Sequence, residues 1–98
     1  MLVGTVREVK NNENRVGLTP ESVQELVGHG HTVLVETNAG AGIGATDEVY
    51  ARAGGQIVET AREIFDRVEM IVKVKEPQPS ERAMLREGQI LYAPLRGN

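Results

Sequence analysis

The sequence predicts an α/β fold in which helices cover both faces of an open, mainly parallel β-sheet, as in flavodoxin-like and Rossmann-like proteins. Short β-branched runs alternate with helical patterns along the chain, an order that implies right-handed crossovers between parallel strands. Residues 70–74 are apolar apart from Lys73, as is typical of a strand covered on both faces. A chain of 98 residues is long enough to bury one core.

The first strand, helix and strand are expected in the first third of the chain. Residues 2–6 are mostly apolar and β-branched, which predicts a strand. The Thr-Pro-Glu sequence at 19–21 predicts a helix start, because a capping hydroxyl, an early proline and an early carboxylate all favour one. This helix is expected to stop at the glycines of residues 28–30, before a second strand at Thr32–Glu36.

The middle of the chain predicts two more helices and one more strand. A glycine-rich loop at residues 38–45 leads into a short helix at 47–53. Gln56–Val58 predicts the third strand. The Thr-Ala-Arg-Glu sequence at 60–63 is a capping box, which predicts the start of the third helix.

The last third predicts two strands and one helix. Residues 70–74 are the strongest strand candidate of the chain. A helix capped by Ser80 is expected to run through Leu85, with a stop at Gly88 and a fifth strand at residues 89–92. The whole pattern thus predicts about five strands.

Composition excludes several classes of function. Acidic residues outnumber basic ones and the formal net charge is −3, so we expect no nucleic-acid partner. The chain has no cysteine, which excludes disulfides and thiolate metal sites. No apolar run is long enough to cross a bilayer, so we expect no membrane partner and a cytoplasmic location.

Two cations follow strands of the predicted sheet. Arg15 lies beyond the first strand and Lys75 beyond the fourth, and open α/β sheets bind ligands beyond the carboxyl ends of their strands. A guanidinium holds a carboxylate with two parallel hydrogen bonds, and an ammonium adds a point charge that also reaches a keto oxygen. Both groups together suit a 2-oxo acid. From spacing alone, two solvated surface charges are the commoner interpretation.

Three segments resemble the N-terminal, substrate-binding domain of alanine dehydrogenases. They are residues 10–20 (KNNENRVGLTP), residues 33–36 with 39–42 (VLVE and AGAG), and residues 72–77 (VKVKEP). The resemblance implies that Arg15 and Lys75 hold pyruvate or alanine. For the complete enzyme it implies NAD-dependent interconversion of L-alanine with pyruvate and ammonia. The same domain of proton-translocating nicotinamide nucleotide transhydrogenases is similar more weakly.

The resemblance also implies what this chain lacks. The acid/base histidine of the family falls at Arg96, and a guanidinium cannot shuttle a proton, so no catalytic residue is predicted. The match breaks down over residues 93–98, which indicates a truncation, a frameshift or an added tail. We therefore expect residues 1–98 to form a single, partial substrate-binding domain without the nicotinamide-binding domain. Such a chain should bind no NAD and should be inactive alone.

Two other functions remain open. The first is a non-catalytic module that binds small anions or serves oligomerisation, and the second is a domain related to the transhydrogenases. In each case, apolar faces left bare by missing neighbours favour a homo-oligomer.

Two further motifs carry less weight. Residues 40–45 fit the dinucleotide pattern G-x-G-x-x-A, but Asp47 and Glu48 at the start of the following helix would repel a pyrophosphate, so a tight structural loop is expected. His29 and His31 lack carboxylate or cysteine company, so we expect no metal site there.

Three charged residues lie near the two cations in sequence. Lys73 is expected in the buried strand, with a side chain long enough to reach the rim. Glu13 is a candidate for orienting Arg15, and Glu76 is expected to be a solvated loop charge. None of these three is assigned a catalytic role.

Overall fold

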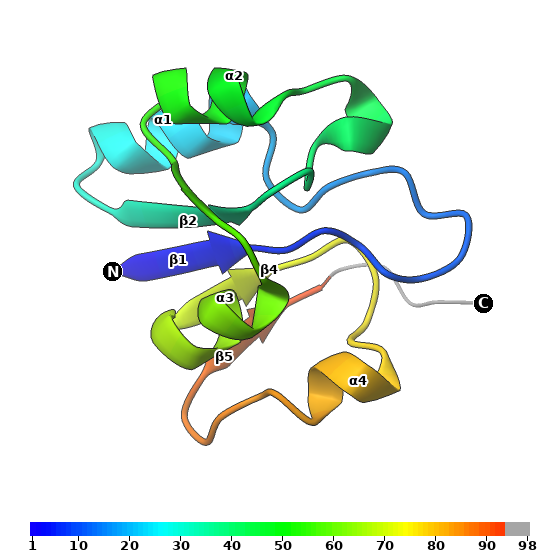
Figure 1. Ribbon diagram of the computed structural model, residues 1–98. Coiled ribbons are helices and arrows are strands. Elements are labelled where there is room, and N and C mark those ends of the chain that lie inside the picture. Colours follow the sequence, from blue (N-terminus) through cyan, green and yellow to red (C-terminus); the bar gives the residue numbers. More distant parts are fainter. Residues whose placement is uncertain (94–98) are drawn as a thin grey trace.

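A five-stranded, fully parallel sheet forms the centre of the protein, whose computed structural model describes residues 1–93 (Figure 1). The strands lie in the order β3-β2-β1-β4-β5. Their bounds are Leu2–Thr5 for β1, Thr32–Glu36 for β2, Gln56–Val58 for β3, Met70–Val72 for β4 and Ile90–Tyr92 for β5. Because a helix carries the chain back across the sheet between successive strands, all pairs are parallel. The predicted fold class is confirmed.

Helices cover both faces of this sheet. Their bounds are Pro20–Gly28 for α1, Asp47–Arg52 for α2, Ala61–Arg67 for α3 and Pro79–Arg82 for α4, with a 3-10 turn η1 at Ala41–Ile43. Figure 1 shows α1 and α2 on one face and α3 on the other. Strand β2 supplies both apolar clusters, since Val33 and Val35 pack with α1 and α2 while Leu34 packs with α3.

The predicted helix starts at α1 and α3 are confirmed by their caps. Thr19 Oγ1 accepts a hydrogen bond from the main-chain N–H of Ser22 at 3.2 Å. Thr60 Oγ1 accepts one from the N–H of Glu63, also at 3.2 Å. Each hydroxyl satisfies a donor that the first turn would otherwise leave unpaired.

The strand predicted at residues 70–74 is shorter than expected. It ends at Val72, and the N–H of Val74 donates to the Glu8 side chain at 3.0 Å rather than to a neighbouring strand. The main-chain N–H of Lys73 still donates to the Tyr92 carbonyl oxygen of β5 at 2.9 Å, and the Glu8 side chain then takes the place of a main-chain partner at Val74.

The last helix also differs from its prediction. Gln78, not Ser80, is its N-cap, and it ends at Arg82 rather than Leu85. The main-chain N–H of Gln78 donates to Glu81 Oε1 at 2.8 Å, which fixes the first turn two residues earlier than the sequence indicated.

The two central strands bring their following loops to one edge of the sheet. Thr5 at the end of β1 is paired with Val72 at the end of β4, and its hydroxyl donates to the Val72 carbonyl oxygen at 2.8 Å. Gly17 lies directly against this point, since a Cβ there would approach the same carbonyl oxygen to 2.2 Å. The loop after β1 thus folds back onto the end of β4.

No helix within residues 1–93 is long and apolar enough to span a membrane.

Candidate functional site

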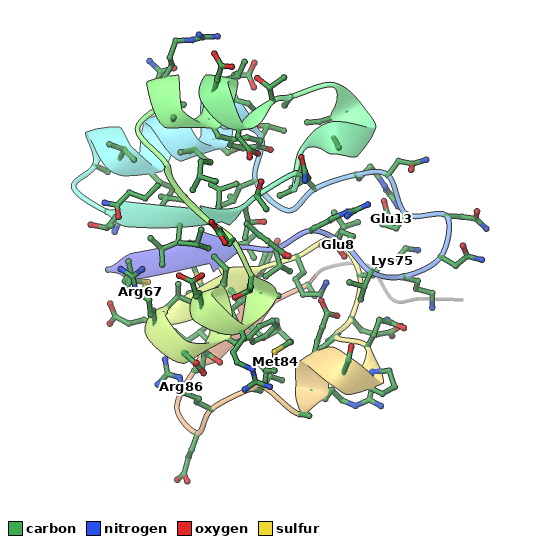
Figure 2. All side chains as sticks on the ribbon, viewed as in Figure 1. Glu8, Glu13, Arg67, Lys75, Met84 and Arg86 are labelled. Carbon is green, nitrogen blue, oxygen red and sulfur yellow. The ribbon has the colours of Figure 1, made fainter. Side chains whose placement is uncertain are left out.

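The candidate site lies beyond the carboxyl ends of β1 and β4. The loop after β1 supplies Glu13 and Arg15, and the loop after β4 supplies Lys75. Figure 2 shows Glu13 and Lys75 together at this edge, with Glu8 beside them. We call the three residues Glu13, Arg15 and Lys75 the cation rim.

A bidentate ion pair joins Arg15 to Glu13. Arg15 Nε donates to Glu13 Oε2 at 2.9 Å and Nη2 donates to Oε1 at 3.0 Å, while the Arg15 main-chain N–H donates to Oε2 at 2.8 Å. The Glu13 side chain is only 4% exposed, whereas that of Arg15 is 58% exposed. The guanidinium lowers the pKa of Glu13 below its ordinary value, and the carboxylate in turn raises the pKa of Arg15.

Lys75 reaches the same carboxylate from the other loop. Its Nζ lies 4.0 Å from Glu13 Oε1, and its side chain is 20% exposed. The two cations singled out from the sequence are therefore within reach of one carboxylate group. That carboxylate belongs to the protein, so Glu13, Arg15 and Lys75 form one internal ion cluster.

A hollow of about 370 Å³ opens beside Arg15. Apart from the arginine, its walls are mostly apolar, with Val16, Ile43, Val72, Val74 and Tyr92 among them. A cation at the edge of an apolar hollow can accept a small molecule that carries one carboxylate and an apolar remainder. Arg15 also lines a smaller recess of about 110 Å³, together with Glu8 and Glu13.

Glu8 is the residue that sequence reasoning missed. Its carboxylate and the Lys73 ammonium are each 1% exposed and lie 2.9 Å apart. Lys73 also lies 3.1 Å from Glu81 Oε2, so its side chain points into a buried cluster and does not reach the rim. A lysine inside an apolar strand signals a buried carboxylate partner, but a sequence separation of 65 residues hides which one.

The glycine loop, residues 38–45, has its own internal partners. Asp47 accepts a hydrogen bond from the Thr37 hydroxyl at 2.5 Å and from the Asn38 main-chain N–H at 2.9 Å. A Cβ on Gly42 would meet the carbonyl oxygen of Asn14 at 2.1 Å, so the loop packs against the segment that carries Arg15. These contacts are those of a tight structural loop.

The remaining sequence candidates do not join the cation rim. His29 Nε2 lies 3.8 Å from the exposed Glu25, and His31 Nδ1 lies 3.3 Å from the N-terminal amine. Within residues 1–93, no three His, Asp or Glu side chains are grouped as a metal site would require. Arg96, which stands at the position of the family's acid/base histidine, lies outside the described residues.

Comparison with known proteins gives a consistent result. Residues 4–96 match the family described as alanine dehydrogenase/PNT, N-terminal domain. The chain is 53% identical over 95 residues to an alanine dehydrogenase of Methanococcus maripaludis and 47% identical over 95 residues to one of Bacillus subtilis. These matches cover 97% of this chain but 26% and 25% of the relatives, so the chain spans about a quarter of their length.

Solved structures agree with the sequence matches. A structure of an L-alanine dehydrogenase is similar with a TM-score of 0.91 and 48% identity, over 95% of this chain and 26% of that one. A transhydrogenase structure from Sinorhizobium meliloti is similar with a TM-score of 0.90 and 30% identity, over 97% of this chain and 27% of that one.

Proposed function

The chain belongs to the alanine dehydrogenase/PNT N-terminal domain family, and on that premise we propose that its cation rim binds the carboxylate of a small 2-oxo acid of the pyruvate class. One observation carries the proposal. The carboxylate of Glu13 is held by the Arg15 fork and lies 4.0 Å from Lys75, so the rim has the shape and charge that grip a carboxylate.

Each cation has its own part in this grip. Among residues 1–93, Arg15 Nη1 has no partner, so the outer edge of the guanidinium is free for a ligand carboxylate. Lys75 supplies the point charge for the adjacent keto oxygen, and the apolar hollow beside Arg15 takes the methyl group. The Glu13 carboxylate neutralises one of the two positive charges of Arg15 and Lys75. One net positive charge then remains to attract the carboxylate of a ligand.

We further propose that the rim serves the reaction named by its relatives, as part of a longer protein. There, Arg15 and Lys75 would hold and orient the 2-oxo acid or alanine, and NAD bound by another part of that protein would supply the hydride chemistry. The described residues do not fit NAD themselves, because Asp47 already takes the main-chain N–H of Asn38 and adds a negative charge in the first turn of the helix after the glycine loop. Without a proton-shuttling histidine, the chain alone should show no turnover.

A binding module without catalysis is the second candidate. The specific observation in its favour is the edge strand β5, where Ile90 and Tyr92 are 48% and 58% exposed and could pack against another subunit. This candidate predicts self-association whether or not pyruvate is bound, and sedimentation at several concentrations tests it.

An NMR titration of the 98-residue chain with pyruvate tests the main proposal. We expect weak, saturable shifts of the amides near residues 15 and 75, because a rim open to water screens the charges. Lys75→Ala and Arg15→Ala should each weaken binding by about tenfold, whereas His29→Ala is the control and should change nothing. Saturable shifts that persist in the double variant lacking both cations would show that the ligand binds elsewhere.

A further inference from the structure

The Glu8 carboxylate makes three contacts with successive residues of the loop after β4. Its Oε1 lies 2.9 Å from Lys73 Nζ, and its Oε2 accepts a hydrogen bond from the Val74 main-chain N–H at 3.0 Å. The N–H of Lys75 lies 3.4 Å from Oε1, a longer and weaker contact. One buried side chain from the loop after β1 therefore holds the Lys73 side chain and the main chain of residues 74 and 75.

Stability alone is a weak reason for this arrangement. Lys73 is shared by Glu8 and Glu81, so two carboxylates and one ammonium are buried with a net negative charge. Removing ions from water costs several kcal/mol for each, and apolar side chains of similar volume often serve stability equally well. A geometric role explains the cluster better, because its carboxylate bonds to the main chain beside Lys75.

We propose that Glu8 is a positioning residue of the anion site. It lies on the same loop as Glu13 and Arg15, and its carboxylate fastens that loop to the segment that carries Lys75. The spacing of the two cations is therefore set by a buried carboxylate. This inference rests on the proposed function, since the spacing matters only if an anion is bound between the cations.

The first arm of the test needs no ligand. Hydrogen exchange of the wild-type chain, followed by NMR, should show the Val74 amide as protected as the amides of β4, although Val74 lies beyond the strand. Fast exchange at Val74, at the rate of an open loop, would mean that the carboxylate does not hold the main chain and would overturn the proposal.

The second arm compares two substitutions around the same lysine. Glu8→Gln and Glu81→Gln each remove one of the two carboxylates beside Lys73, but only Glu8→Gln disturbs the bonds to the main chain of Val74 and Lys75. Glu81 instead accepts from the main-chain N–H of Gln78, at the start of α4. We expect Glu8→Gln to weaken pyruvate binding about tenfold and Glu81→Gln to leave it within about twofold. Equal affinities for wild type and Glu8→Gln, or equal losses in the two variants, would contradict a positioning role.

Glu8→Asp covers the case in which Glu8→Gln does not fold. It keeps the charge but is one methylene shorter, so it can hold the lysine or the main chain but not both. Loss of Val74 protection together with weaker pyruvate binding would support the proposal, and unchanged binding would overturn it.

The outcomes also separate the two proposals. If the wild-type chain does not bind pyruvate although Val74 is protected, the proposed function is wrong, and with it the anion role of Glu8. If the wild type binds pyruvate and Glu8→Gln binds it equally well, the positioning inference alone is wrong.

Discussion

Two loops at the same edge of the sheet use charge in opposite ways. In the cation rim, the Arg15 guanidinium lowers the pKa of Glu13 and keeps a carboxylate ionised between two cations. Beside the glycine loop, burial raises the pKa of Glu36 at the end of β2, and Asp47 takes the nearby donors. The surroundings of Glu13 therefore favour its charged form, whereas those of Glu36 disfavour it.

This difference teaches that a glycine motif does not by itself make a phosphate site. The pattern G-x-G-x-x-A is present at residues 40–45, but a phosphate also needs free main-chain N–H groups and a positive potential. Here the glycines have another use. Gly42 allows the glycine loop to touch the Asn14 main chain, next to Arg15, so this loop buttresses the cation rim.

The largest effect is expected from a substitution that disrupts the contact between the glycine loop and the Asn14 main chain. Gly42→Ala places a Cβ 2.1 Å from the Asn14 carbonyl oxygen, a clash with main chain that no rotamer relieves. We expect the free energy of unfolding to fall by about 3 kcal/mol, measured by urea denaturation. Gly28→Ala is the matched control, because nothing lies within 4 Å of its added Cβ, and it should be neutral or slightly stabilising. If the two variants were equally stable, the close contact between Gly42 and the Asn14 main chain would not support the cation rim.

The second effect tests geometry against charge within the cation rim. Arg15→Lys keeps the positive charge but loses the planar fork, so pyruvate affinity should fall about tenfold, nearly as much as in Arg15→Ala. The affinity of the wild type should also decrease as salt is added. NMR titrations at two ionic strengths measure both effects. A lysine variant with wild-type affinity would show that charge alone defines the site.

The third effect uses pH to separate the two loops. The pKa of folded Glu13 is lowered from 4.5, so its contribution to stability is complete above pH 4.5 and is lost as the pH falls through the lowered value. The pKa of folded Glu36 is raised, so its contribution is complete below pH 4.5 and is lost as the pH rises through the raised value.

Two single variants test these opposite dependences of stability on pH. Unfolding of Glu13→Gln and Glu36→Gln should be compared with wild type between pH 3 and 7. The free energy of unfolding of Glu13→Gln should lie below that of wild type by an amount that shrinks toward acid pH. Wild type, in contrast, should lose stability relative to Glu36→Gln as the pH rises toward neutral. If both stability differences changed with pH in the same direction, the surroundings of Glu13 and Glu36 would not shift the two pKa values in opposite directions.

The smallest effect is expected for NAD at the glycine loop. Calorimetry should show an affinity no tighter than the millimolar range of unspecific contacts, because Asp47 and Glu48 stand at the start of α2. Pyruvate titrated under the same conditions is the positive control. Micromolar NAD binding would reverse the assignment of the glycine loop.

Much of the fold was predictable because its signals are local. The caps at Thr19 and Thr60 and the apolar run ending at Val72 depend on neighbours within a few residues, so the elements and their order could be derived. The error at the end of β4 arose where a distant side chain intervened. Glu8 ends β4 early, since it takes the N–H of Val74 across a gap of 66 residues in sequence.

The sequence by itself determined the order of strands and helices, the family resemblance, and the two cations that follow β1 and β4. Only the tertiary structure decided that β1 and β4 are neighbours, that both cations lie within 4.0 Å of Glu13, and that Lys73 turns inward to Glu8 and Glu81. The physical reason is the range of the forces. Helix caps and apolar periodicity act between adjacent residues, whereas a buried ion pair exists only after packing has brought distant segments together and excluded water from them.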